Sequence, residues 1–239
     1  MQPVREAIRA HGSALGSVIV ERATGEAAGR LDALARFAEA QGVSQVERAP
    51  RSTLDRLAAG ALHQGAVAWA PALRIHESAE VLAGESFLIL ALDGVQDPQN
   101  FGAAIRSAVA LGATAIVWAE HSSAPLTPAT FRASAGAIEH ATLCRVPSLV
   151  RFLDDALGQG ARVIGLAADG TVALHREDLR GSTVLVVGSE HEGLARAVRK
   201  RCTSVARLTL RGPVESLNAS VAAAIAVHLA QIQRENSGS

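Results

Sequence analysis

The strongest constraint on the fold is a regular alternation of short apolar runs and helical patterns after residue 86. Short, continuous apolar runs are typical of parallel strands that are buried on both faces. The runs are Phe87–Leu92, Thr114–Trp118, Arg162–Leu166, Thr183–Val187 and Val205–Leu210. Helical patterns lie at Gln99–Leu111, Leu149–Gly158, Leu194–Arg201 and, at the end, from about Ser216 to Arg234. The alternation predicts an α/β domain with a mainly parallel sheet and helices on both of its faces.

The first 71 residues predict a second, smaller α/β unit. Its expected helices are Pro3–Ala10, a segment in which Leu31, Leu34, Ala35 and Ala38 recur at helical spacing, and Ser52–Ala59. Its expected strands are Ser17–Glu21, Val43–Val46 and Gly65–Ala70. The following stretch combines proline, glycine and acidic residues with little apolar periodicity. We therefore expect domains at residues 1–71 and 86–239, joined by a linker at 72–85.

Composition limits the classes of function. The 239 residues include 23 Lys+Arg and 23 Asp+Glu, so the formal net charge is zero, which argues against a uniformly basic nucleic-acid coat. Cys144 and Cys202 form neither a disulfide framework nor a metal-binding spacing, so we expect reduced thiols and no metal. The apolar stretch Val221–Ile232 is too short to span a bilayer, and the N-terminus lacks the plan of a signal peptide. We expect a cytoplasmic protein with no membrane partner.

One stretch concentrates positive charge without any carboxylate inside it. Its members are Arg196, Arg199, Lys200, Arg201, Arg207 and Arg211. A charge run of this kind is either a solvated helix face or part of a track for the phosphates of RNA. The sequence leaves both interpretations open.

Polar residues gather in three segments that follow predicted strands, where ligands of parallel sheets bind. In the first, Asp97 is a suitable N-cap and Pro98 a suitable first helical residue. Gly102 lies in the first turns, where glycine costs about 1 kcal/mol relative to alanine, so we expect a backbone or a ligand to pass close by. Asn100 and Arg106 suit a hydroxyl and a phosphate. A surface salt bridge is the alternative for Arg106.

The second segment, Gly188-Ser-Glu-His-Glu-Gly193, places two glycines around polar residues. It is either a loop wrapped around a ligand or a plain strand-to-helix turn. It is not a P-loop, because Leu194 follows where that motif has lysine, and the chain has no G-x-G-x-x-G fingerprint, which disfavours an NAD-type oxidoreductase. In the third segment, a strand is expected to end at Gly212-Pro213. Ser216 and Asn218 then start the last helix, either as caps or as ligand-binding groups.

Together and in this order, the three segments resemble the SpoU-type RNA 2′-O-ribose methyltransferases of the SPOUT superfamily, the TrmH-like enzymes. The matching motifs are Asp97–Ala108, Gly188–Gly193 and Glu215–Ser220, with Ser134-Ala-Gly-Ala137 resembling a segment between the first two. The resemblance covers about Phe87 to Ile232. The first 70 residues are similar to the small ribosomal-protein-like RNA-binding domain that many members carry. Thr209 departs from the pattern, since members often have proline there.

The resemblance implies a small N-terminal α/β RNA-binding domain and a C-terminal parallel-sheet α/β domain with a deep trefoil knot, threaded from about residue 160. It implies S-adenosylmethionine as cofactor, a homodimer, and methylation of a ribose 2′-hydroxyl in structured RNA. A guanosine of 23S ribosomal RNA is the first expectation. Transfer RNA, an antibiotic-resistance target, and an RNA-binding or ribosome-assembly role without methyl transfer are the alternatives.

The resemblance also implies the site residues. The expected cofactor-binding residues are Ala167, Gly188, Ser189, Glu190, Gly193, Leu208, Leu210, Leu217 and Asn218. The expected catalytic residues are Arg106, Asn100, Glu190, Ser216 and Asn218. Family models sometimes use the arginine as a base, but a guanidinium keeps its proton to about pH 12, so that role would need a pKa shift of about five units or more. Our hypothesis is that Arg106 acts as a cation that holds the adjacent phosphate and the developing oxyanion.

Overall fold

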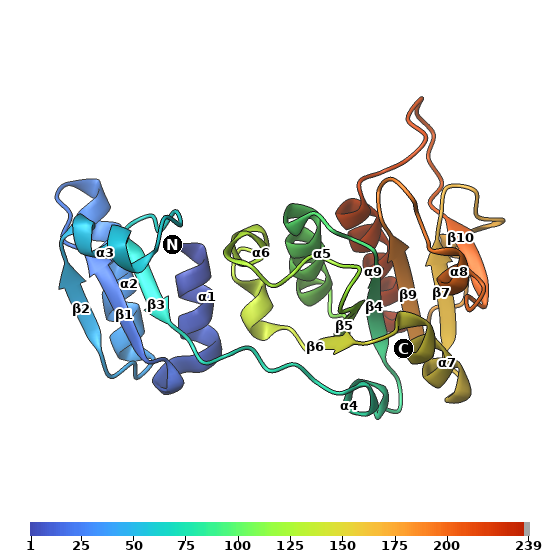
Figure 1. Ribbon diagram of the computed structural model, residues 1–239, viewed down its shortest axis with the longest axis horizontal. Coiled ribbons are helices and arrows are strands. Elements are labelled where there is room, and N and C mark those ends of the chain that lie inside the picture. The colour runs from blue at the N-terminus through green and yellow to red at the C-terminus, as the bar shows by residue number, and fades with distance from the viewer. Residues whose placement is uncertain (237–239) are drawn as a thin grey trace. The chain divides into compact units, whose positions relative to one another are not determined.

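The computed structural model describes residues 1–236 and forms two compact units (Figure 1). The smaller unit comprises Met1–Leu73 together with Ala135–His140, and the larger comprises Arg74–Ser134 and the chain from Ala141 onward. The stretch expected to be a linker contains helix α4, Ser78–Leu82, whose Val81 and Leu82 are buried in the core of the larger unit. No helix within residues 1–236 is long and apolar enough to cross a membrane.

The smaller unit is a three-stranded sheet with strand order β2-β1-β3. β1 (Ser17–Glu21) runs parallel to β2 (Val46–Ala49) and antiparallel to β3 (Ala66–Trp69). The helices are α1 (Gln2–His11), α2 (Glu26–Ala40) and α3 (Arg51–Leu57), with short 3-10 turns at Gly12–Ala14 and Ala137–His140. The four α2 residues expected at helical spacing are buried, which confirms that helix.

The strand expected at Val43–Val46 begins only at Val46. The reason lies in how α2 ends. Gly42 adopts a φ of 80°, and the amide of Val43 donates to the carbonyl of Ala38 at 3.1 Å, so the chain is still closing the helix there. Val43 is therefore buried as part of the helix end and not as part of the sheet.

The larger unit is built on a seven-stranded sheet with order β6-β5-β4-β9-β7-β10-β8, and every neighbouring pair is parallel. The strands are β4 (Leu88–Asp93), β5 (Ala115–Ala119), β6 (Leu143–Val146), β7 (Arg162–Leu166), β8 (Val172–Ala173), β9 (Thr183–Gly188) and β10 (Ser204–Arg207). β4 and β9 are buried at every position, as expected for a central pair covered on both faces. The predicted parallel α/β architecture is confirmed.

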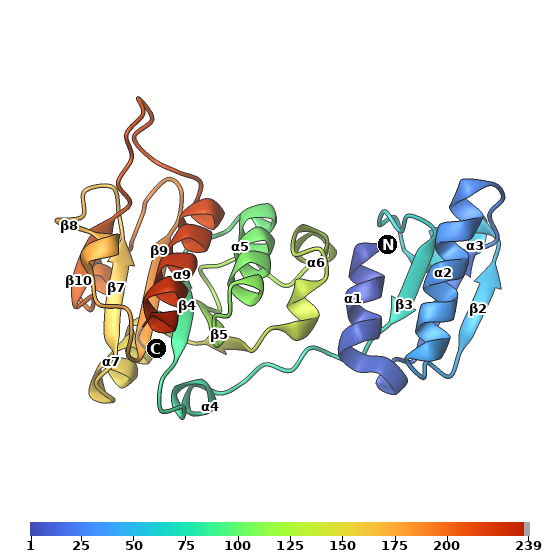
Figure 2. The ribbon, with the colours of Figure 1, turned by 180° about the vertical axis from the view of Figure 1, so that it is seen from behind.

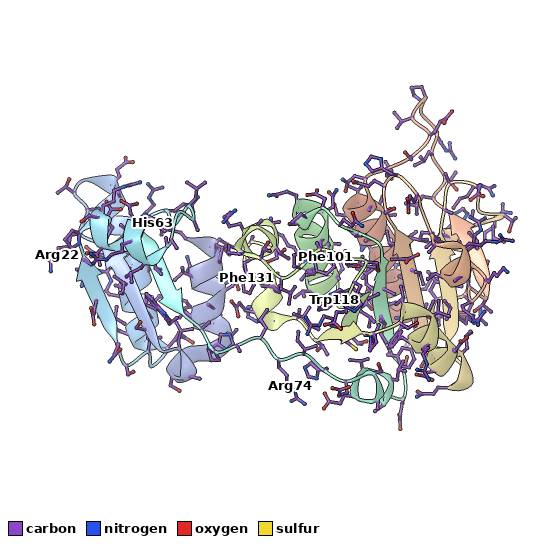
Figure 3. All side chains as sticks on the ribbon, in the orientation of Figure 1. Arg22, His63, Arg74, Phe101, Trp118 and Phe131 are labelled. Carbon is purple, nitrogen blue, oxygen red and sulfur yellow. The ribbon has the colours of Figure 1, made fainter. Side chains whose placement is uncertain are left out.

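Helices cover both faces of this sheet. They are α5 (Pro98–Ala110), α6 (Pro128–Ala133), α7 (Leu149–Gly158), α8 (Arg196–Arg199) and α9 (Ala219–Glu235), with α4 and a 3-10 turn at Leu174–Arg176. α4, α7 and α8 share one apolar core with the sheet. α9 packs on β4, β9 and α5, and Figure 2 shows it in front of the sheet. Phe101 of α5 meets Trp118 of β5 edge to face at 5.5 Å (Figure 3).

The third polar segment differs most from expectation. The strand predicted at Val205–Leu210 ends at Arg207, because its neighbours β7 and β8 offer no residue to pair with beyond that point. The expected strand end at Gly212-Pro213 and the expected helix start at Ser216 are therefore wrong. Residues 208–218 form neither helix nor strand, and α9 begins at Ala219. α8 is likewise shorter than the predicted Leu194–Arg201.

Candidate active site

The loop after β9 is shaped by its two glycines. Ser189 and Gly193 exchange both backbone hydrogen bonds, at 3.2 and 3.0 Å, and Gly193 has a φ of 64°. A Cβ on Gly188 would overlap the carbonyl of Gly193 and the amide of Leu194. Both glycines are thus required by the fold of the loop itself. The loop presents Glu190, His191 and Glu192 to solvent.

The start of α5 is fixed by its cap, as predicted. The carboxylate of Asp97 accepts from the amides of Gln99 and Asn100 at 3.2 and 3.3 Å, and Pro98 is the first helical residue. The expected close approach at Gly102 is also confirmed. A Cβ there would lie 2.6 Å from the carbonyl oxygen of Thr130, so the close neighbour is the backbone of α6.

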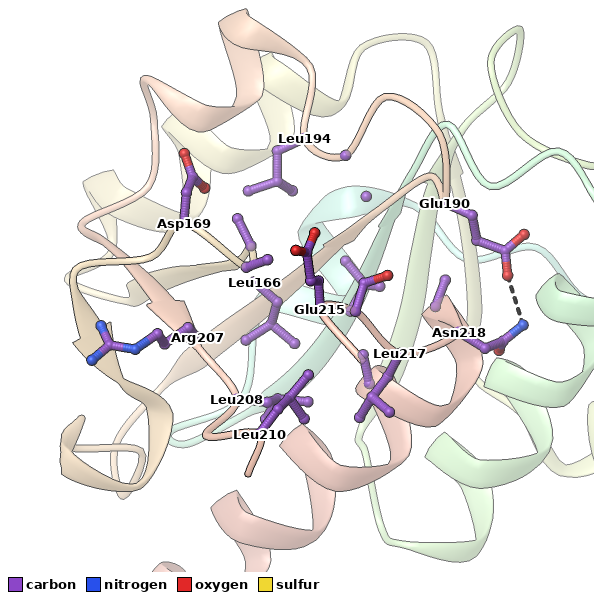
Figure 4. Close-up of a pocket in the computed structure, with 18 of the residues that line it drawn as sticks. Leu166, Asp169, Glu190, Leu194, Arg207, Leu208, Leu210, Glu215, Leu217 and Asn218 are labelled. Carbon is purple, nitrogen blue, oxygen red and sulfur yellow. Dashed lines mark hydrogen bonds between the residues drawn. The ribbon is translucent and has the colours of Figure 1, made fainter. Parts of the chain in front are cut away.

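One hydrogen-bonded cluster joins the three polar segments. Asn100 Nδ2 donates to Glu190 Oε1 at 2.7 Å, and Asn218 Nδ2 donates to the same oxygen at 2.6 Å. Asn218 Nδ2 also lies 2.8 Å from Asn100 Oδ1, its second acceptor. Figure 4 shows the bond between Glu190 and Asn218 at the edge of a cavity. We call these three residues the amide–carboxylate cluster.

Asn218 is both a helix cap and a member of the cluster. Its Oδ1 accepts from the amide and the hydroxyl of Ser220 at 2.9 and 2.6 Å, which caps α9. Its Nδ2 faces the other way, towards Glu190 and Asn100. The structure thus confirms the cap at Asn218, while its expected ligand-binding role stays a prediction.

A cavity of about 1050 Å³ lies beside this cluster, at the carboxyl ends of β7, β9 and β10. All nine expected cofactor-binding residues line it: Ala167, Gly188, Ser189, Glu190, Gly193, Leu208, Leu210, Leu217 and Asn218. Ser216 lines it as well. The cavity is also lined by residues that the sequence analysis did not assign to the cofactor, among them Leu166, Asp169, Arg199, Arg207 and Glu215. The sequence signals for these residues were the basic stretch for Arg199 and Arg207, the third motif for Glu215, and a position at or after a predicted strand for Leu166 and Asp169.

Arg106 stands apart from the cavity. It lies on α5, and its exposed side chain makes no hydrogen bond or ion pair with residues 1–236. The structure thus does not place it in a surface salt bridge within this part of the chain. Its expected catalytic role stays a prediction.

Half of the basic stretch is engaged within the molecule. Arg199 makes two hydrogen bonds of 3.0 Å to Asp169, and this guanidinium lowers the pKa of that carboxyl. Arg201 donates to Asp154 at 2.6 Å. Arg207 donates to the backbone carbonyls of Gly170 and Thr171. Arg199 and Arg207 thus hold the loop after β7 beside the cavity, whereas Arg201 is joined to α7.

Asp93, which the sequence did not single out, anchors the loop after β9. It ends β4, is only 7% exposed, and its Oδ2 accepts from the amide of Ala195 at 2.7 Å. Burial raises the pKa of Asp93. Burial also raises the pKa of Cys144 and of Cys202 to about 11, so both free thiols are protonated at neutral pH.

Comparison with known proteins places this geometry in a family. Residues 87–228 match the model described as the SpoU rRNA Methylase family, and residues 1–75 match that for RNA 2'-O ribose methyltransferase substrate binding. An "Uncharacterized tRNA/rRNA methyltransferase" of Mycobacterium sp. (strain KMS) is 39% identical over 238 residues, which is 98% of this chain and 74% of that protein. The "23S rRNA (guanosine-2'-O-)-methyltransferase RlmB" of Xylella fastidiosa is 38% identical over 195 residues, 80% of this chain and 78% of that protein.

Solved structures agree with the match. The SpoU methyltransferase AviRb from Streptomyces viridochromogenes superimposes with a TM-score of 0.76 at 25% identity, covering 99% of this chain and 88% of that one. The same enzyme in complex with the cofactor AdoMet shares the fold, with a TM-score of 0.74 at 24% identity over 98% and 88% of the two chains. The motifs expected from the sequence meet at one cavity edge in a fold of this kind. The chain belongs to the SpoU rRNA methylase family.

Proposed function

We propose that this chain transfers a methyl group from S-adenosylmethionine to a ribose 2′-hydroxyl in structured RNA. The observation that carries the proposal is the amide–carboxylate cluster, which links Asn100, Glu190 and Asn218 beside the large cavity. Membership of the SpoU family and the match of residues 1–75 to a substrate-binding model support the RNA substrate.

The cavity suits the cofactor in size and in chemistry. Pockets for small molecules and cofactors are usually about 300–1,000 Å³ and mostly apolar, with a few polar groups. Here Leu208, Leu210 and Leu217 offer apolar surface for an adenine ring, and Gly188 and Gly193 bring backbone close to it. Ala167, Ser189, Glu190 and Asn218 complete the proposed binding set. When bound, S-adenosylmethionine supplies an electrophilic methyl group on a sulfonium.

The protein must then handle the proton of the attacking hydroxyl. An alcohol is a poor nucleophile at neutral pH, so the site has to stabilise its oxygen as the proton leaves. We assign that electrostatic task to Arg106, and we assign the orientation of the ribose to Asn100, Glu190, Ser216 and Asn218. The hydrogen bonds of the cluster support a positioning role for its members, because they fix the two amides against one carboxylate.

Arg106→Lys tests the assignment of Arg106. The lysine keeps a positive charge but loses the planar fork that binds a phosphate through two bonds. We expect turnover to fall clearly while cofactor affinity is unchanged. Near wild-type turnover in Arg106→Lys would contradict the idea that Arg106 binds a phosphate through two hydrogen bonds.

For the substrate, we favour a guanosine of 23S ribosomal RNA, in line with the relative named RlmB. Transfer RNA is the second candidate, because other relatives are named tRNA/rRNA methyltransferases. We also propose that the protein acts in the cytoplasm. Mapping 2′-O-methyl sites in ribosomal and transfer RNA of a deletion strain decides between the two.

The direct test uses labelled S-adenosylmethionine and transcribed RNA. Ribose methylation protects the adjoining phosphodiester from alkali, because the 2′-oxygen is the nucleophile of alkaline cleavage. We therefore expect label in alkali-resistant dinucleotides. Label in single nucleotides would indicate base methylation, and a chain with no affinity for S-adenosylmethionine by calorimetry would be an RNA-binding module instead.

We also propose a homodimer formed through α9. Val221, Ile225 and Ile232 are 45%, 37% and 39% exposed, and their spacing puts them on one face of the helix. Leu210, Val214 and Leu217 extend this apolar surface along the cavity segment. A second copy seated there would cover the open side of residues 208–217. We expect Ile225→Arg to give monomers in sedimentation, whereas Leu62→Arg, on the smaller unit, leaves dimers intact.

The deep trefoil knot remains a proposal too. Its support is the strand order, in which β10 lies between β7 and β8 and the chain then returns to pack α9 on β4 and β9. If the knot is present, we expect the larger unit to refold more slowly than unknotted parallel-sheet domains of its size.

A further inference from the structure

The charged side chains that line the large cavity carry more negative than positive charge. They are the carboxylates of Asp169, Glu190, Glu192 and Glu215 and the guanidiniums of Arg199 and Arg207. Arg199 is paired with Asp169 through two hydrogen bonds. Arg207 donates to backbone carbonyls, and Figure 4 shows its guanidinium directed away from the leucines of the cavity. Three carboxylates are therefore left without a cation.

Glu215 is the most informative of the three. Glu190 is held by two amides, and Glu192 also lines a second cavity on the other side of its loop. The side chain of Glu215 makes no hydrogen bond or ion pair with residues 1–236. Glu215 lines the cavity, and Figure 4 shows its carboxylate directed towards Leu194, although the residue as a whole is exposed. An unpaired carboxylate in this position attracts a cation in the cavity with the strength of a solvent-screened charge pair.

We propose that Glu215 is a specificity-determining residue that recognises the sulfonium of S-adenosylmethionine and so distinguishes the cofactor from its demethylated product. This rests on the proposed function. The transferred methyl has to face the amide–carboxylate cluster, and Glu215 lies in the same segment as Asn218, on the cavity side. Glu215 precedes Asn218 by only three residues, so a methyl group that faces the cluster places the sulfonium close to the segment that carries Glu215.

The methyl-transfer reaction changes the charge of the sulfur that Glu215 would contact. When the ribose oxygen takes the methyl, the sulfur keeps the electron pair of the broken bond and becomes a neutral thioether, while the hydroxyl proton leaves the oxygen. S-adenosylmethionine and S-adenosylhomocysteine thus share the ammonium, the carboxylate and the adenosine, and differ by one positive charge. Glu215 attracts the first more than the second, which favours exchange of spent cofactor for fresh cofactor.

Calorimetry of both ligands on the intact protein tests the proposal. We expect Glu215→Gln to lower the affinity for S-adenosylmethionine by roughly threefold to tenfold, the effect of one screened charge pair at several ångströms. The affinity for S-adenosylhomocysteine should fall by less than about twofold. High salt should reduce the wild-type preference, since it screens the pair. The matched control is Glu85→Gln, which removes the same charge from an exposed position outside the cavity.

Each other outcome is decisive. Equal weakening of both ligands would mean that Glu215 contacts a part they share, and no change in either would mean that it contacts neither; both overturn the proposal. If Glu85→Gln changed the two affinities in the same way, the effect would come from the net charge of the protein and not from Glu215, which also overturns the proposal. If the wild type binds neither ligand, the proposed function itself falls. If it binds both but the ratio does not respond to Glu215→Gln, only the role of Glu215 falls.

Discussion

The interior of β4 and β9 and the loops at their carboxyl ends are a few residues apart and differ in almost every property. Along the strands every residue is buried, and nearly all are apolar. Beyond the ends of β9 and of its sheet partner's neighbour β10, the residues Glu190, Ser216 and Asn218 are exposed and polar. The strands fix where the loops begin, while the loops carry groups whose loss leaves the core intact. Stability and chemistry should therefore respond to separate substitutions.

The largest effect is expected inside the strands. Leu90 is fully buried at the centre of β4, so Leu90→Ala should lower the free energy of unfolding by about 2–5 kcal/mol through lost burial and a new cavity. Chemical denaturation measures this. Cofactor affinity well below the melting temperature should stay unchanged. The control, Leu62→Ala, alters a residue that is 83% exposed and should change stability very little.

The opposite pattern is expected in the loop. Glu190→Ala removes the acceptor that holds Asn100 and Asn218, and a loss of positioning of this kind lowers turnover about 100-fold, or roughly 2.7 kcal/mol. Stability should move by only about 0.5 kcal/mol, because the side chain is exposed. Glu190→Gln keeps an acceptor oxygen and should retain more activity. A stable Glu190→Ala with normal turnover would contradict the role of the cluster.

Gly188 sits where the two regions meet. Gly188→Ala would force a Cβ into the backbone of Gly193 and Leu194, so we expect a loss of about 1–3 kcal/mol together with weaker cofactor binding. Gly158→Ala is the matched control, since a Cβ there meets nothing within 4 Å. Thermal melts and calorimetry follow the two quantities. If Gly188→Ala changed only one of them, the loop and the strand end would be independent.

The smallest effect concerns Asp93, the one carboxylate buried in β4. Burial raises its pKa in the folded state, so the protein loses stability as pH rises from the ordinary value of about 3.9 through the raised one. Asp93→Asn keeps an acceptor for the amide of Ala195 but does not ionise. The variant should gain stability relative to wild type as pH rises from 4 to 8 in denaturation curves. A pH-independent difference would rule out this ionisation as the cause.

The same contrast explains what the sequence could predict. β4 and β9 were predictable because their runs are uniformly apolar. β6 was missed because the exposed Arg145 interrupts a strand of only 4 residues. α4 was taken for part of a linker because Val81 and Leu82 are its only buried apolar pair. Local patterns were sufficient only where burial was continuous.

The site was predictable in its parts and not in its assembly. The motifs located Gly188, Glu190 and Asn218, and the cavity contains them all. The bond between Asn100 and Glu190 joins residues 90 positions apart, and no spacing rule predicts such a contact. Asp93 and Glu215 were missed for the same reason, because their surroundings come from other segments.

The amide–carboxylate cluster also has a consequence for biosynthesis. Asn218 bonds to Asn100 across 118 residues and to Glu190 across 28, so Asn218 is the last member of the cluster to be translated. A nascent chain that ends before Asn218 already contains the whole of β4, β9 and the loop after β9, yet its cluster lacks one amide and its cavity lacks a wall. The cluster and the cavity wall can therefore be completed only after Asn218 and the start of α9 have left the ribosome.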